Sequence, residues 1–206
     1  MPQTEPPNRA LLSEKLSALA ALTHERPVPL GEVAASLGGN AAHLLNFILA
    51  LPFVIPLPTA GLSTALGLVI AAGSLRLIQG REPGLPAKLA AKTLPAGFLS
   101  KLLRASRRVV LVLEKLLRPR LVRFAGAARL HAALVFCAAL VLLLPLPIPF
   151  SNTFPAWSIL LAAAGLLERD GLAILAGYLV ALAGVACLFL AGCAGAGLWE
   201  QIRGWF

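Results

Sequence analysis

Apolar residues occur in long runs along this chain, and two of these runs resemble each other. Residues 47–70 read FILALPFVIPLPTAGLSTALGLVI, and residues 136–159 read FCAALVLLLPLPIPFSNTFPAWSI. An offset of 89 positions (136 minus 47) aligns Phe47 with Phe136 and superimposes the two Pro-x-Pro sequences. The pattern indicates an internal repeat.

Each copy of the repeat predicts two apolar helices separated by a proline break. Proline lacks an N–H, and its ring clashes with the preceding turn, so neither run can form one straight helix. The resulting helical hairpins cover residues 41–79 and 130–167. Their helix breaks are Pro56, Pro58, Pro145 and Pro147.

The leading arms of both hairpins are short for a membrane span. Residues 41–55 and 130–144 number 15 in each arm, or about 22 Å at 1.5 Å per residue. The hydrocarbon core of a bilayer is about 30 Å thick. We therefore expect re-entrant half-helices that enter and leave on one side of the membrane. Two ordinary hairpins with kinked spans and no site are the alternative.

Other segments predict helices of different kinds. Residues 9–23 and 97–118 alternate apolar and polar positions at helical spacing, which is typical of amphipathic interfacial helices. A short helix is expected over about 30–37. Residues 172–198 are 27 positions without a charge, enough for one complete, tilted span.

Composition supports an all-α integral membrane protein. Hydrophobic residues make up 58% of the 206 residues, charged residues only 13%, and the mean hydropathy is +0.83. Soluble domains are nearer a quarter charged. We expect an N-terminal tail with an amphipathic helix in residues 1–40 and a membrane domain of two repeats in residues 41–206.

The net charge of +9 is concentrated in the middle of the chain. Eleven Lys or Arg residues against two Glu residues lie between Arg81 and Arg123. Because membrane segments bracket this region, it predicts contact with anionic lipid headgroups at the cytoplasmic face and no nucleic-acid binding. The protein would then be a multi-pass inner-membrane protein with its C-terminus in the periplasm. The basic residues expected at the lipid surface are Lys101, Arg104, Arg107 and Arg108.

Hydroxyl and amide side chains gather at both breaks. They supply hydrogen-bond donors and acceptors, and helix N-termini at the breaks favour anions. If the two tips meet, they would line a polar site for an ion or a lipid- or sugar-linked group. The candidates are Thr59, Ser63, Thr64, Ser151, Asn152 and Thr153. For the last three, helix capping after the break is the alternative.

Charged candidates follow the second hairpin. Glu168, Arg169 and Asp170 adjoin a membrane segment, and ionisable residues there are often functional. A surface turn with a local ion pair is the alternative. His43 and Asn46 share one helical face, near the expected membrane interface.

No pattern indicates a cofactor, a metal or an enzyme. The cysteines have no metal-ligand spacing and are expected to be small buried residues. His43 and His131 begin the leading arms, distant along the chain from the tip serines, and no nucleophile elbow or nucleotide loop is present. The three cysteines are Cys137, Cys187 and Cys193.

The chain resembles the ExoD family of bacterial exopolysaccharide-synthesis membrane proteins over roughly residues 25–195. The resemblance rests on ALPFVIPLPTAGLSTALGL with LIQGREPGLP, on LEKLLRPRL, and on LPLPIPFSNTFPAWSILLAAAGLLERDG. It departs from the family where the usual Pro-Trp-Leu-Pro is Pro83-Gly84-Leu85-Pro86. The resemblance implies an inner-membrane protein linked to exopolysaccharide production, without an established enzymatic activity.

Two functions from different classes fit these expectations. The first is transport or translocation through a site where the two broken hairpins meet. The second is a non-transporting accessory or scaffold subunit that contacts polysaccharide-synthesis proteins. A stripe of small residues every four positions would favour close helix packing and a homodimer. The stripe consists of Ala183, Cys187, Ala191 and Gly195.

Overall fold

The computed structural model describes residue 20 and residues 28–37, 41–54, 62–81, 85–93, 96–144 and 151–203. Within these residues the fold is helical, and no strand forms beyond two isolated bridges. The helices are α2 (Leu30–Leu37), α3 (Ala41–Val54), α4 (Leu62–Ile78), α5 (Ala87–Ala90), α6 (Ala96–Leu116), α7 (Val122–Ala125), α8 (Ala128–Leu143), α9 (Thr153–Glu168) and α10 (Gly171–Arg203). The four expected hairpin arms correspond to α3, α4, α8 and α9. The amphipathic helix expected over 9–23 and all four proline breaks lie outside the described residues.

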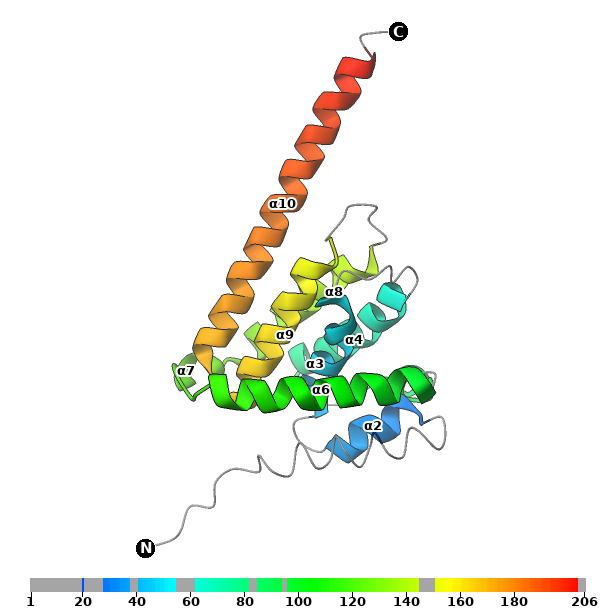
Figure 1. Ribbon diagram of the computed structural model, residues 1–206, viewed down its shortest axis with the longest axis vertical. Coiled ribbons are helices and arrows are strands. Elements are labelled where there is room, and N and C mark those ends of the chain that lie inside the picture. Colours follow the sequence, from blue (N-terminus) through cyan, green and yellow to red (C-terminus); the bar gives the residue numbers. More distant parts are fainter. Residues whose placement is uncertain are drawn as a thin grey trace, which may run out of the picture.

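The four apolar arms form a bundle in which the two hairpins interlock (Figure 1). Helix α4 packs mainly against α8, and α3 packs mainly against α9. Large aliphatic and aromatic side chains from α3, including Phe47 and Ile48, are fully buried in the core. Each hairpin is therefore held by the other more than by its own second arm.

The leading arms α3 and α8 begin at the same end of the bundle. Asn46, near the start of α3, contacts Ser74, near the end of α4. Gly80, just after α4, lies against the side chain of Arg129 at the start of α8. The two pairs of arms consequently point the same way.

Glycine allows a close approach between α4 and α8. A Cβ at Gly67 on α4 would lie 3.2 Å from the Cβ of Leu142 and 3.3 Å from the carbonyl oxygen of Ala139. Both contacts are tighter than an ordinary side chain permits without displacement. The start of α4 thus lies directly on the end of α8.

Helix α6 lies crosswise to the bundle near the end at which α10 begins (Figure 1). Its apolar face packs against α3, and its polar face carries exposed basic side chains. The buried positions recur at helical spacing and are Leu99, Leu102, Leu103, Ser106 and Val110. The prediction of an amphipathic helix over 97–118 is confirmed, as is the short helix over 30–37.

Helix α10 has 33 residues and extends well past the bundle (Figure 1). Among the described residues it is the one helix long and apolar enough to cross a membrane, over Gly171–Cys193. The other apolar helices are shorter, at 14 to 17 residues. The outer face of α10 is apolar and exposed, with Leu179 68% and Phe189 70% exposed. The predicted helix over 172–198 is confirmed as an element.

The expectation that the three cysteines are small buried residues is wrong, whereas the homodimer expected from the small-residue stripe stays a prediction. All three cysteines are exposed, because each lies on an outward face of α8 or α10. Ala183 and Cys187, which belong to the small-residue stripe, are also exposed. Gly177 and Gly184 pack against α9 instead, since α9 contacts a different face of α10 from the stripe.

Candidate functional site

The first predicted tip is described only at its edge. Thr59 lies outside the described residues, and the side chain of Ser63 lies outside them as well. Thr64 is exposed in the first turn of α4. The prediction that the two tips form one polar site stays a prediction.

The second tip is described from Ser151 onward. Ser151 is buried, while Asn152 and Thr153 are half-buried. Asn152 occupies the N-cap position of α9, and its carbonyl oxygen accepts a hydrogen bond from the N–H of Ala156 at 3.2 Å. Its side chain makes no capping hydrogen bond. The alternative of side-chain capping therefore does not account for the amide of Asn152.

The charged turn after α9 has a well-defined structural role. Asp170 is 3% exposed, and its Oδ1 accepts hydrogen bonds from the N–H groups of Leu172 and Ala173 at 3.0 and 3.4 Å. Its Oδ2 accepts from the N–H of Arg118 at 3.1 Å. Asp170 thus caps α10 and holds the end of α6 beside it. Neighbouring Arg169 is exposed in the left-handed region, with a φ of 55°.

A buried polar cluster at the base of the bundle was not found by sequence reasoning. His131 is fully buried, and its Nε2–H donates to the carbonyl oxygen of Phe124 at 2.8 Å. The Nδ1 of the ring lies 3.3 Å from the hydroxyl of Tyr178, which also donates to the carbonyl oxygen of Leu130 at 3.3 Å. The cluster joins α7, α8 and α10. The available signal was the single tyrosine of the chain, placed in its most apolar segment.

His43 and Asn46 have separate surroundings despite sharing a helical face. His43 lies half-buried in the first turn of α3. The Nδ2 of Asn46 is 3.5 Å from the Oγ of Ser74, inside the core. The sequence placed both histidines at the starts of the leading arms, far along the chain from the tip serines, and His43 and His131 do lie near the starts of α3 and α8.

Two further polar atoms are buried in the bundle without a hydrogen-bond partner among the described residues. They are the Oγ of Ser158 on α9 and the Nε of Arg76 on α4. Such groups are costly in a dry interior unless water or a ligand reaches them. They mark the interior as less uniformly apolar than the sequence pattern suggests.

The predicted lipid-surface residues lie on one exposed face. Lys101, Arg104, Arg107 and Arg108 are all exposed on α6. Helix α6 lies crosswise at one end of the bundle (Figure 1), so its exposed basic side chains form a basic face there. No group of three or more potential metal ligands occurs within the described part of the chain.

Comparison with known proteins finds one matching family and two similar sequences. The family model described as "Exopolysaccharide synthesis, ExoD" matches residues 12–190. The chain is 33% identical to Protein ExoD of Rhizobium meliloti over 171 residues, covering 81% of this chain and 71% of that protein. It is 31% identical to an uncharacterized protein of Synechocystis over 155 residues, covering 74% and 73% of the two chains. No solved structure matches.

Proposed function

The chain belongs to the ExoD family, which is implicated in exopolysaccharide synthesis, and we propose that it translocates an ion or a lipid- or sugar-linked group in that process. It acts as a multi-pass protein of the bacterial inner membrane. The cargo passes through a site where the two broken hairpins meet. No enzymatic step and no cofactor are part of this proposal.

The close contact of Gly67 with Leu142 carries the proposal. Gly67 lies a few residues after the first break, and Leu142 lies a few residues before the second. A Cβ at Gly67 would lie closer to α8 than nearly all Cβ contacts in proteins do, so α4 and α8 approach closely here. The contact supports a common location for the two breaks, since the start of α4 and the end of α8 lie side by side.

The shortness of the arms supports a polar site within the membrane. Broken backbone at membrane depth must be covered by protein or by a water-filled cavity, because hydrocarbon leaves its N–H and C=O groups unsatisfied. Helices of 14 to 17 residues end before the far surface if α10 spans the bilayer beside them. The breaks would then lie below that surface, where broken helices of transporters bind their cargo.

The second tip supplies the chemistry for a cargo. Ser151, Asn152 and Thr153 present hydroxyl and amide groups, and the Asn152 side chain is not used in capping. Thr64 from the first hairpin adds a hydroxyl near the start of α4. These groups both donate and accept hydrogen bonds, which suits an ion or a sugar more than an acyl chain.

An accessory role in a polysaccharide synthesis or export complex is the second candidate. The exposed apolar residues of α10 favour it, because they offer a long surface to a partner helix. Flux through proteoliposomes made from the purified chain would support translocation. Co-purification with synthesis proteins, together with the absence of flux, would support the accessory role.

Asn152→Ala tests the tip site. We expect loss of flux in proteoliposomes and of exopolysaccharide output in cells, with normal protein level and assembly, because the amide is removed without disturbing a cap. Gln79→Ala is the matched control, since Gln79 is exposed at the opposite end of α4. Wild-type flux and output from the Asn152 variant would reject the tip site.

A further inference from the structure

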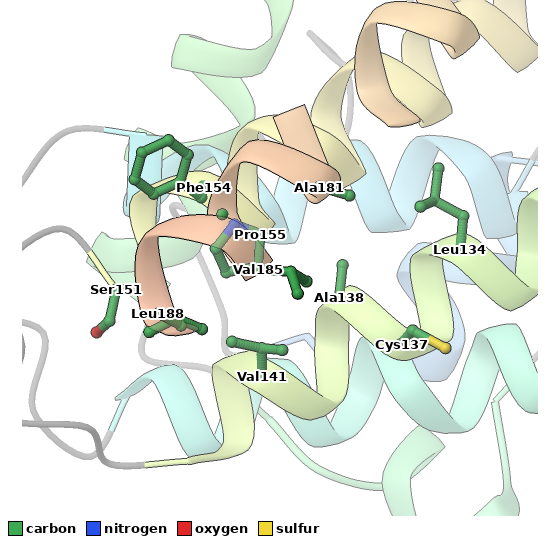
Figure 2. Close-up of a pocket in the computed structure, with 11 residues that line it drawn as sticks. Leu134, Cys137, Ala138, Val141, Ser151, Phe154, Pro155, Ala181, Val185 and Leu188 are labelled. Atoms are coloured by element: carbon green, nitrogen blue, oxygen red, sulfur yellow. The ribbon is translucent and has the colours of Figure 1, made fainter. Parts of the chain in front are cut away.

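A cavity of about 110 Å³ lies between α8, α9 and α10 (Figure 2). It exists because Gly177 and Gly184 hold α10 tightly on α9, whereas α10 barely touches α8. A Cβ at Gly184 would lie only 2.8 Å from the Cβ of Phe154. We call this cavity beside α8 the α8–α10 groove.

The α8–α10 groove is almost purely hydrocarbon. Its walls carry Leu134, Ala138 and Val141 from α8 and Ala181 and Leu188 from α10, with no charged side chain. Ser151 and Cys137 supply the two lining side chains with a heteroatom, and they lie at opposite ends of the ring of lining residues (Figure 2). A polar or charged occupant would lose its hydration here without finding partners.

The groove opens to the outside at the middle of the candidate membrane span. Cys137 is exposed, and Val185 on the other wall is 63% exposed. Residues 181–188 lie in the central part of Gly171–Cys193. The surface just beyond the groove continues as apolar side chains, with Leu182 64% exposed. In a membrane, the opening would therefore face lipid chains.

We propose that the α8–α10 groove binds one acyl chain of a bilayer phospholipid. The inference rests on the membrane placement in the proposed function, but it does not need translocation. A cavity of about 110 Å³ with hydrocarbon walls and an opening among exposed apolar side chains suits a hydrocarbon chain. An acyl chain there would restore the van der Waals contacts that the gap between α8 and α10 removes. It would also seal the bundle beside Ser151, next to the second tip.

Photolabelling of the full-length protein in nanodiscs tests the proposal. The probe is phosphatidylethanolamine with a diazirine within one acyl chain, and the adducts are located by mass spectrometry. We expect adducts concentrated on the groove walls, above all on residues 134–141 and 181–188. Uniform adducts along the exposed face of α10 would overturn the proposal, because they would indicate ordinary solvation by lipid.

Two variants on the same helix separate filling of the groove from a general change of surface. Ala181→Phe places a ring in the groove and should abolish the groove adducts. Ala183→Phe, on an exposed position outside the lining, should keep them. Equal labelling of both variants would contradict the proposal. The wild-type adduct map remains decisive if Ala181→Phe does not fold.

A second probe separates the source of the chain. A diazirine polyprenyl phosphate in the same nanodiscs should label the groove less than the phospholipid does, and preferential polyprenyl labelling would overturn the assignment. Asn152→Ala should retain the acyl-chain adducts. A wild-type protein that labels but shows no flux would reject translocation and leave the groove assignment standing.

Discussion

Asp170 shows how a single side chain fixes the junction of three helices. Its carboxylate accepts hydrogen bonds from N–H groups of both α10 and the segment after α6, while the N–H of Gly171 donates to the carbonyl oxygen of Arg120 at 2.6 Å. A carboxylate at a helix N-terminus is favoured by the unpaired N–H groups and by the helix dipole. At this position, a residue that the sequence offered as a cargo ligand has its oxygens occupied by the backbone.

Replacing Asp170 with Ala should lower the stability of the protein. We expect a loss of about 1–3 kcal/mol in the free energy of unfolding, since a helix cap disappears and a buried N–H loses its acceptor. Asp170→Asn keeps one carbonyl acceptor and should cost less. Thermal unfolding in detergent measures both. Arg169→Ala, at an exposed neighbour, is the control, and the same melting temperature for the Asp170 and Arg169 variants would contradict the capping role.

Among the elements, α6 combines two surfaces with different partners. Its apolar face contacts α3, so the helix is part of the folded unit and not a separate tail. Its basic face points away from the bundle, at the end where the leading arms begin. A long helix with this division typically lies in the plane of a membrane interface. Each exposed Lys or Arg would add about 1 kcal/mol of attraction to anionic lipid.

Neutralising the basic face should release anionic lipid. The triple variant Lys101→Gln, Arg107→Gln and Arg108→Gln is expected to co-purify with less anionic lipid than the wild-type protein. The loss of three charges should weaken the binding free energy for anionic lipid by up to about 3 kcal/mol at low salt. Lipid mass spectrometry of the purified protein measures this. Arg107→Lys with Arg108→Lys keeps the charge and should retain the lipid. Unchanged lipid content in the Gln variant would count against the interfacial role of α6.

At the scale of the whole molecule, α10 differs from the interlocked bundle because it is longer than the bundle helices and less buried. The bundle buries its arms against one another, whereas α10 is largely exposed over residues 182–193 and extends past the bundle (Figure 1). The basic face of α6 lies at the end where α10 begins. In the described part of the chain, a charged end is thus followed by one long apolar helix that leads away from it. Such a shape fits insertion with the charged end in the cytoplasm.

This arrangement predicts opposite locations for α6 and the end of α10. In a variant without native cysteines, Arg108→Cys should be protected from a membrane-impermeant maleimide in cells with a permeabilised outer membrane. A phosphatase fused after residue 206 should be active in the periplasm. If the cysteine reacts and the fused enzyme is also active, or if neither occurs, α10 does not cross the membrane.

The sequence by itself determined where most helices begin and end and which family the chain belongs to. Helix limits follow from local features, such as the prolines after Val54 and Leu144 and the uncharged run after Asp170, and these act within a few residues. The tertiary structure decided which faces meet. Gly177 and Gly184, not the stripe with Ala183 and Cys187, face α9.

The candidate site divides in the same way. The tip candidates were identified from sequence spacing alone. The role of Asp170 and the contact between His131 and Tyr178 could be identified only from the tertiary structure. Those partners are 47 to 52 residues apart along the chain. Periodicity reports the face of a residue on its own helix, but a partner at that separation depends on how all the helices pack. For this reason, the pairing of the hairpins and the α8–α10 groove could be seen only in three dimensions.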